Sequence, residues 1–157
     1  KCVRAVAQRF TGVEHRIELV RELNGVRYYN DSIGTSPTRT MACLDSFDQK
    51  LILIAGGYDK GVPFTQLGVE IVKKVKTLIL TGATAKAIRQ AVEEGPGYEE
   101  SGLEIVETDD LAAAVAAAQA EAVSGDVVVL SPACAAFDQF KNFMERGKAF
   151  KELVNAL

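Results

Sequence analysis

The chain has 157 residues, of which 48% are hydrophobic and 25% are charged, as is ordinary for one soluble domain. Its formal net charge of −3 argues against binding to nucleic acid or to an anionic membrane. No apolar run approaches the roughly 20 residues that span a bilayer, and no signal peptide is recognisable. We therefore expect a cytoplasmic protein. Because the first residue is Lys1, we interpret the chain as a piece of a longer polypeptide.

The first predicted element is an antiparallel hairpin. Two apolar segments flank Asn24-Gly25, a pair that favours a tight two-residue turn: Ile17–Val20 and Val26–Tyr29. After a polar loop, Ser36 followed by Pro37 predicts the N-cap and first position of a helix. That helix carries its apolar residues on one side: Met41, Leu44 and Phe47.

Strands and helices then alternate to the end of the chain. The predicted strands are Leu51–Ile54, Thr77–Leu80, Glu104–Val106 and Val127–Leu130. The predicted helices are Leu67–Val75, Ala83–Glu93, Asp109–Val123 and a last one with an apolar stripe at Phe140, Phe143, Met144, Gly147, Phe150, Val154 and Leu157. This alternation predicts an α/β, Rossmann-like fold: a mostly parallel sheet with helices on both faces and the hairpin as an antiparallel edge.

In such a sheet, ligands bind where the strands end. Four loops qualify: Asn30–Ser36, Ala55–Gly61, Thr81–Thr84 and Ser131–Phe137. Lys60, in the glycine-rich second loop, could direct a cation at a carboxylate or phosphate, although a solvated lysine is an equal alternative. We also expect the last helix to begin directly after the fourth loop, so that its free N–H groups form an anion-binding corner.

The other polar residues leave alternatives open. Asp31 and Ser32 fit either a contact with a ribose or a metal-bound water, or an Asx-turn, and the turn is favoured. His15, the only histidine, has no assignable catalytic partner, and Cys134 is best explained as a small buried hydrophobe. Cys2, Cys43 and Cys134 lack metal-ligand spacing and are predicted to be free thiols. The residues alone therefore predict binding of a small anion, with most catalytic machinery elsewhere.

Several motifs together resemble a known family. They are Gly12–Arg16, Tyr29–Ser32, Ile54–Gly57 with Lys60, and Leu130–Phe143 followed by Glu145-Arg146-Gly147. In this order they resemble the C-terminal domain of the Mur ligases, closest to the members that add D-glutamate, over essentially the whole chain. The resemblance implies a single domain, residues 1–157, from a three-domain ATP-dependent ligase whose N-terminal and central ATPase domains are absent here.

The family's reaction joins an amino acid to a nucleotide-linked acceptor. The resemblance implies that ATP phosphorylates UDP-N-acetylmuramoyl-L-alanine and that D-glutamate attacks the acyl phosphate, a step of peptidoglycan synthesis in the cell wall. ATP and Mg²⁺ would bind mainly through the absent central domain. The chain alone would then be inactive, and a monomer is expected.

The resemblance also assigns site residues. It places Thr35 and Lys60 at the D-glutamate carboxylates, with Phe137, Phe143 and the position of Ala136 lining the same pocket. Two further residues would reach the nucleotide when the domain closes: Arg16 at a phosphate and Asp31 at the ribose.

Three departures from the family pattern concern these assignments. Ile33 stands where many members have lysine, and Ala136 stands where many have serine. Asp59 lies next to Lys60, so the register of that loop could differ by one residue. These departures concern the residue assignments more than the family. Two alternatives also stay open: a ligase of the same superfamily that adds another amino acid, and a non-catalytic module that binds a small anion.

Overall fold

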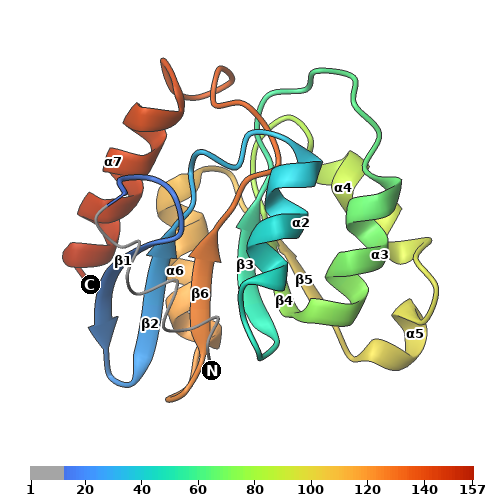
Figure 1. Cartoon of the computed structure of the whole chain (residues 1–157), viewed down its shortest axis with the longest axis horizontal. Helices are drawn as coiled ribbons and strands as arrows, with labels where there is room; N and C mark the ends of the chain where they lie inside the picture. The colour runs from blue at the N-terminus through green and yellow to red at the C-terminus, as the bar shows by residue number, and fades with distance from the viewer. Residues whose placement is uncertain (1–12) are drawn as a thin grey trace.

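The computed structural model describes residues 13–157, which form one six-stranded sheet with helices on both faces (Figure 1). The strands are β1 (Glu18–Leu23), β2 (Val26–Asn30), β3 (Leu51–Ala55), β4 (Val75–Leu80), β5 (Glu104–Glu107) and β6 (Val127–Leu130). The helices are α2 (Pro37–Asp45), α3 (Thr65–Lys74), α4 (Ala85–Glu93), α5 (Tyr98–Ser101), α6 (Leu111–Glu121) and α7 (Phe143–Asn155). The predicted α/β class is confirmed.

The hairpin forms as the turn signal predicts. β1 and β2 pair antiparallel, with Leu23 opposite Val26. Asn24 and Gly25 between them have φ of 55° and 80°, the left-handed values that a two-residue turn of this type needs. β2 then pairs parallel with β6, so the hairpin lies at one edge of the sheet.

The strand order is β1-β2-β6-β3-β4-β5, and every pair after the hairpin is parallel. The chain moves outward from β3 to β5 and then returns through α6, so that β6 lies between β2 and β3. This reversal is a topological switch point, beside which open α/β sheets bind ligands. Because β2, β6, β3 and β4 run in one direction, the loops that follow them share one edge, the upper one in Figure 1.

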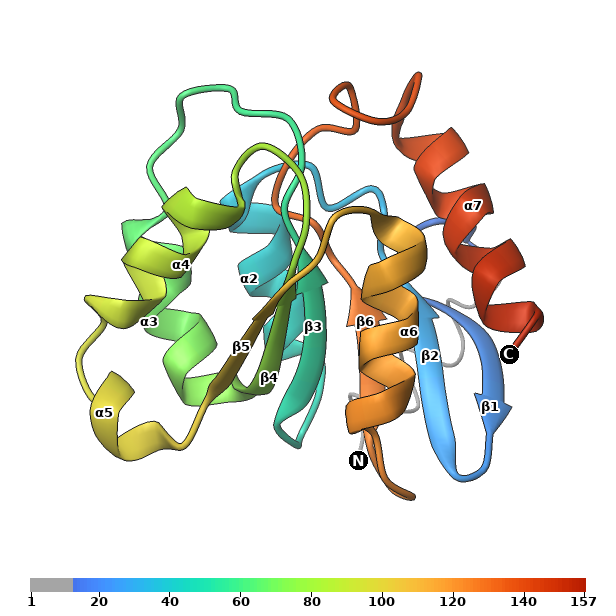
Figure 2. The same cartoon turned by 180° about the vertical axis from the view of Figure 1, so that it is seen from behind.

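Two cores cover the sheet. α2, α3 and α4 pack on one face, and α6 and α7 pack on the other, as Figures 1 and 2 show from opposite sides. In β3, successive side chains point to opposite faces of the sheet: Leu51 and Leu53 belong to the first core, whereas Ile52 and Ile54 belong to the second. All four are fully buried, as the continuous apolar run predicts.

The helix ends test the predicted boundaries. Ser36 caps α2 by accepting a hydrogen bond from Arg39 N (3.3 Å), with Pro37 next, as predicted. The last helix begins later than predicted, because Asn142 caps it and α7 starts at Phe143. Met144, placed in the apolar stripe, is 46% exposed, so that assignment was wrong.

Cys43 and Cys134 are buried free thiols, and Cys2 lies outside the described residues. Within residues 13–157, no helix is both long enough and apolar enough to cross a membrane.

Candidate functional site

The four predicted loops meet at the edge where β2, β3, β4 and β6 end (Figure 1). Backbone hydrogen bonds join them directly: Gly56 N donates to Pro132 O (2.9 Å), and Ala133 N donates to Gly34 O (2.8 Å). Because these bonds already satisfy the inner backbone groups, the loops form a pre-organised platform.

Gly56 and Gly57 of the second loop lie so close to neighbouring backbone that a side chain would not fit. Gly56 has φ of 112°, and a Cβ at this position would overlap the carbonyl oxygen of Thr81. A Cβ on Gly57 would meet the carbonyl oxygen of Ala135 at 2.6 Å. Gly57 N donates to Thr84 Oγ1 (3.0 Å). The loop that carries Lys60 is thus fixed against both of its neighbours.

Lys60 and Thr35, the two residues assigned to the D-glutamate carboxylates, lie together. Lys60 Nζ donates to the carbonyl oxygen of Thr35 (3.1 Å), and the lysine is exposed. Asp59 accepts a bond from Gly61 N (2.8 Å), so it shapes the turn after Lys60. The ammonium group retains donors for an incoming carboxylate.

The residues assigned to the pocket lining do not all converge. Phe137 is 63% exposed, and its ring packs edge-on against Tyr58 with centroids 5.9 Å apart. Ala136 is buried behind it, at 2% exposure. Phe143 instead packs edge-on against His15, with centroids 6.0 Å apart. Phe137 and Tyr58 therefore form an exposed aromatic pair at the loop tips, whereas Phe143 supports a different part of the edge.

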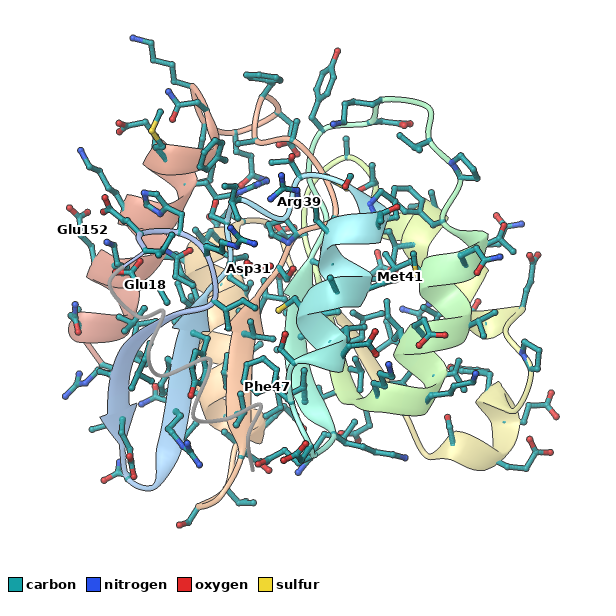
Figure 3. All side chains as sticks on the ribbon, viewed as in Figure 1. Glu18, Asp31, Arg39, Met41, Phe47 and Glu152 are labelled. Carbon is teal, nitrogen blue, oxygen red and sulfur yellow. The ribbon has the colours of Figure 1, made fainter. Side chains whose placement is uncertain are left out.

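Arg16 and Asp31, the two residues assigned to the nucleotide, line one groove of about 400 Å³. Ile33 and Arg39 line it as well. Figure 3 shows Asp31 and Arg39 near the first turn of α2, with Phe47 below the last turn. Both arginines are exposed, and among residues 13–157 neither guanidinium has a hydrogen bond or ion pair. The groove therefore combines two available cations with one buried carboxyl group.

Asp31 is held by the protein on both carboxylate oxygens. Oδ1 accepts a bond from Ile17 N (3.1 Å), and Oδ2 accepts one from Ser131 Oγ (2.7 Å). Burial raises the pKa of Asp31 to about 6, against the lowering effect of these bonds. The Asx-turn favoured for Asp31 is made by its neighbour instead, since Asn30 Oδ1 accepts from Ser32 N (3.0 Å).

Arg146, which the sequence analysis named only as part of a motif, contacts the first of the four loops. It is buried, its Nε donates to Ser32 Oγ (3.0 Å), and its Nη2 donates to Ser32 O (2.9 Å). Burial lowers its pKa to about 10. Ser32 Oγ in turn donates to Phe143 O (2.7 Å). The available signal was an arginine beside Gly147, inside the apolar side of the last helix.

The last helix does not begin directly after the fourth loop, so the predicted helix start in the anion-binding corner was wrong. After β6 the backbone continues as a loop, in which Ala133 has φ of 63° and Ala135 forms a β-bridge with Tyr58 of the second loop. The helix begins only at Phe143. Asn142 Oδ1 already accepts a bond from Glu145 N (2.9 Å), so the helix provides its own cap.

Cys134 behaves as the small buried group that was predicted. Its Sγ lies 3.2 Å from Thr84 Oγ1, and burial raises the pKa of its thiol. Among residues 13–157, no three His, Cys, Asp or Glu side chains are grouped to hold a metal ion. The exposed side chains of Lys60, Arg16 and Arg39 suit the described platform to anion binding.

Comparison with known proteins agrees with this geometry. The sequence model of the family "Mur ligase, glutamate ligase domain" matches residues 15–134. The UDP-N-acetylmuramoylalanine–D-glutamate ligase of Acetivibrio thermocellus is 55% identical over 157 residues, covering 99% of this chain and 34% of that protein. The corresponding ligase of Clostridium kluyveri is 52% identical over 153 residues, covering 98% and 33%.

Solved structures show the same fold at low sequence identity. The UDP-N-acetylmuramate-alanine ligase MurC of Thermotoga maritima has a TM-score of 0.58 at 14% identity, covering 94% of this chain and 31% of that one. A Mycobacterium tuberculosis folylpolyglutamate synthase complexed with ADP has a TM-score of 0.62 at 13% identity, covering 89% and 32%. The chain spans about a third of the length of the curated relatives it matches. By its sequence and its fold, the chain belongs to the Mur ligase family and corresponds to the glutamate ligase domain.

Proposed function

We propose that the chain is the C-terminal, amino-acid-binding domain of a three-domain ATP-dependent ligase that adds D-glutamate to UDP-N-acetylmuramoyl-L-alanine. The observation that carries the proposal is the identity, above half of the residues and over nearly the whole chain, with ligases named for D-glutamate. The full enzyme would be a cytoplasmic monomer of peptidoglycan synthesis. This domain would be inactive alone, because it lacks the ATPase machinery.

The amino-acid side of the site is built around Lys60 and Thr35. The bond from Lys60 Nζ to the backbone carbonyl oxygen of Thr35 holds the lysine beside this residue. One D-glutamate carboxylate could then receive a charged hydrogen bond from Lys60 and a neutral one from the Thr35 hydroxyl. Phe137 and Tyr58 form an exposed aromatic pair at the tips of the same loops, and domain closure would cover this pair. Closure would exclude water and strengthen the carboxylate contacts.

The nucleotide side of the site is the groove that contains Arg16 and Asp31. Two arginines at its rim suit a phosphoryl group, whose charge they would neutralise as the domain closes. Ile33 occupies the position of the family's lysine, and Arg39 lines the same groove. We assign to Arg39 the positive charge that Ile33 lacks. The Asp31 carboxylate, held by Ile17 and Ser131, keeps lone pairs for a ribose hydroxyl.

In the proposed ligase, bound ATP would supply the phosphoryl group and bound Mg²⁺ would screen its charge. Among the described residues no three His, Cys, Asp or Glu side chains are grouped as metal ligands, and we assign the metal to the central domain on the family resemblance. This domain's residues would orient the amine of D-glutamate and bind the phosphates from the opposite side.

The decisive experiment uses the full-length ligase that contains this chain. Amino-acid-dependent ADP release is measured with UDP-N-acetylmuramoyl-L-alanine as acceptor, comparing D-glutamate, L-glutamate, L-lysine and diaminopimelate. Turnover with D-glutamate alone supports the proposal. Turnover with another amino acid would retain the ligase class and reject the D-glutamate assignment, whereas no turnover with any of the four would favour a non-catalytic binding module.

A further inference from the structure

The turn that carries Arg16 has an unusual backbone. His15 has φ of 67° and Ile17 has φ of 47°, so both neighbours of Arg16 are in the left-handed region. A β-branched residue such as Ile17 is sterically disfavoured there. Strain of this kind persists only where the surroundings enforce it, and it concentrates at functional sites.

The surrounding hydrogen bonds enforce this turn from three directions. His15 N donates to Glu18 Oε1 (3.1 Å), and Ile17 N donates to Asp31 Oδ1 (3.1 Å). Ile33 N donates to the carbonyl oxygen of His15 (3.1 Å). Each residue beside Arg16 is therefore tied to the protein, while the Arg16 side chain is left exposed at the groove.

The His15 ring is the buried anchor of the turn. It is 4% exposed, and its Nδ1 lies 2.9 Å from Asn30 Nδ2. The network assigns the orientation of the Asn30 amide: Ser32 N donates to its Oδ1, and its Nδ2 also donates to Glu18 Oε1 (3.1 Å). Nδ1 must therefore accept a hydrogen bond, so the ring is neutral with its proton on Nε2.

Packing leaves the ring no other position. Phe143 meets it edge-on at an interplanar angle of 87°, and a Cβ on Gly147 would overlap Nδ1. The charged groups that face the ring are Glu14, with Oε2 3.6 Å from Nε2, and Glu18, Lys148 and Lys151. Lys151 Nζ bonds Glu14 Oε2 (2.7 Å) and Glu18 Oε2 (3.2 Å), so it partly neutralises both acids. Burial lowers the pKa of His15, in agreement with the neutral ring.

We propose that His15 and Asn30 are positioning residues that hold the strained turn and thereby present the Arg16 guanidinium to a phosphoryl group of the nucleotide. The inference rests on the proposed function, because it takes the ligand of the groove to be a nucleotide phosphate. Neither residue touches the substrate; both act through Arg16. Protonation of His15 Nδ1 would set it against the Asn30 NH₂ group and release the turn.

The test is a double-mutant cycle in the full-length ligase, with His15→Ala, Arg16→Gln and the double variant. We expect each single change to raise KM for ATP about tenfold, and the double variant to be no worse than Arg16→Gln. KM for D-glutamate should change less than about twofold in all three. Arg27→Gln, at the opposite end of the sheet, is the matched control and should leave KM for ATP unchanged.

A second variant keeps the test valid if His15→Ala does not fold. His15→Asn retains an acceptor near Nδ1 and tolerates positive φ, so KM for ATP should stay close to that of the wild type at neutral pH. On acidification, KM for ATP should rise in the wild type relative to His15→Asn, because only the wild type has an ionisable side chain at position 15. Asp31 titrates in both proteins. The titration of ATP itself is common to both and cancels.

Three results would overturn the inference. The first is a double variant in which the effects of the two single changes on KM for ATP multiply. The second is a folded His15→Asn enzyme whose KM for ATP is raised as much as in His15→Ala. The third is an unchanged KM for ATP in Arg16→Gln. Failure of the proposed function is a separate observation, namely no D-glutamate-dependent ADP release by the wild type. In that case the same cycle is measured as equilibrium binding of ADP, and non-additivity there still supports the positioning role.

Discussion

Asp31→Asn should stabilise the domain at neutral pH while impairing the ligase. The carboxyl group is 4% exposed, and burial raises its pKa from an ordinary 3.8 to about 6. An amide can replace it with little rearrangement. Its oxygen can keep the bond from Ile17 N, and its NH₂ can donate to Ser131 Oγ. The Ser131 proton can then turn to Thr40 Oγ1, which is 2.9 Å away.

The magnitude follows from the two pKa values. An acid with a pKa of about 6 when folded and 3.8 when unfolded binds its proton more tightly in the folded state. The free energy of unfolding therefore falls as pH rises between these values, and the charged Asp31 costs up to about 3 kcal/mol above them. For a chain of this size, that corresponds to a melting temperature roughly 6–12 °C higher in the variant at neutral pH.

The assay is urea unfolding of the wild type and Asp31→Asn at a series of pH values from about 4 to about 7.5. The difference in unfolding free energy between the two proteins isolates Asp31, because the other titrating groups cancel. Asp59→Asn, at an exposed position, is the control for removing one negative charge. A difference that stays flat across the series would refute the reasoning, whatever its absolute value. The predicted functional cost is a raised KM for ATP in the full-length ligase.

Other substitutions test the two sides of the site. Lys60→Ala should raise KM for D-glutamate at least about tenfold with KM for ATP little changed, and an unchanged KM for D-glutamate would remove Lys60 from the site. Arg39→Gln should raise KM for ATP several-fold, and equal values in Arg39→Gln and Arg27→Gln would argue against the assignment of Arg39. Gly147→Ala should destabilise the domain by more than about 2 kcal/mol, because its Cβ would overlap the His15 ring. Gly61→Ala, which meets open space but has φ of 77°, should cost only about 1 kcal/mol. If the two variants lowered the melting temperature equally, the His15 ring would have to move away from the new Cβ at position 147 at little cost.

The fold was predictable because its signals are local. Asn24-Gly25 determines the hairpin turn, Ser36-Pro37 starts α2, and the short apolar runs Leu51–Ile54 and Val127–Leu130 became strands buried on both faces. The start of α7 was missed although a signal existed. Asn142 followed three residues later by Glu145 is a capping pattern, and the structure uses it. The path before it depends on contacts with the second loop, which no local pattern reveals.

The site was predictable only in part. The parallel order places the loops at one edge, so their convergence follows from strand patterns alone. The pairing of Thr35 with Lys60 was suggested by resemblance, and the hydrogen bond between them agrees with it. The roles of His15 and Arg146 were not predictable, because an ionisable side chain becomes buried through partners distant in sequence. For Arg146 these include Ser32, and for His15 they include Asn30.

The loop from Asp31 to Ser36 separates the two sides of the site and also connects them. Its Thr35 carbonyl receives the Lys60 bond on one side, while Asp31 and Ile33 line the arginine groove on the other. Arg146 holds the loop through Ser32, and Ser131 holds it through Asp31. Because these bonds are buried, the loop moves with the platform rather than by itself. If this domain closes on a nucleotide as proposed, the same rigid motion brings Lys60 to the amino acid and Arg16 to the phosphate. Loosening either anchor should therefore weaken binding of both substrates together, unlike a change confined to Lys60 or Arg16.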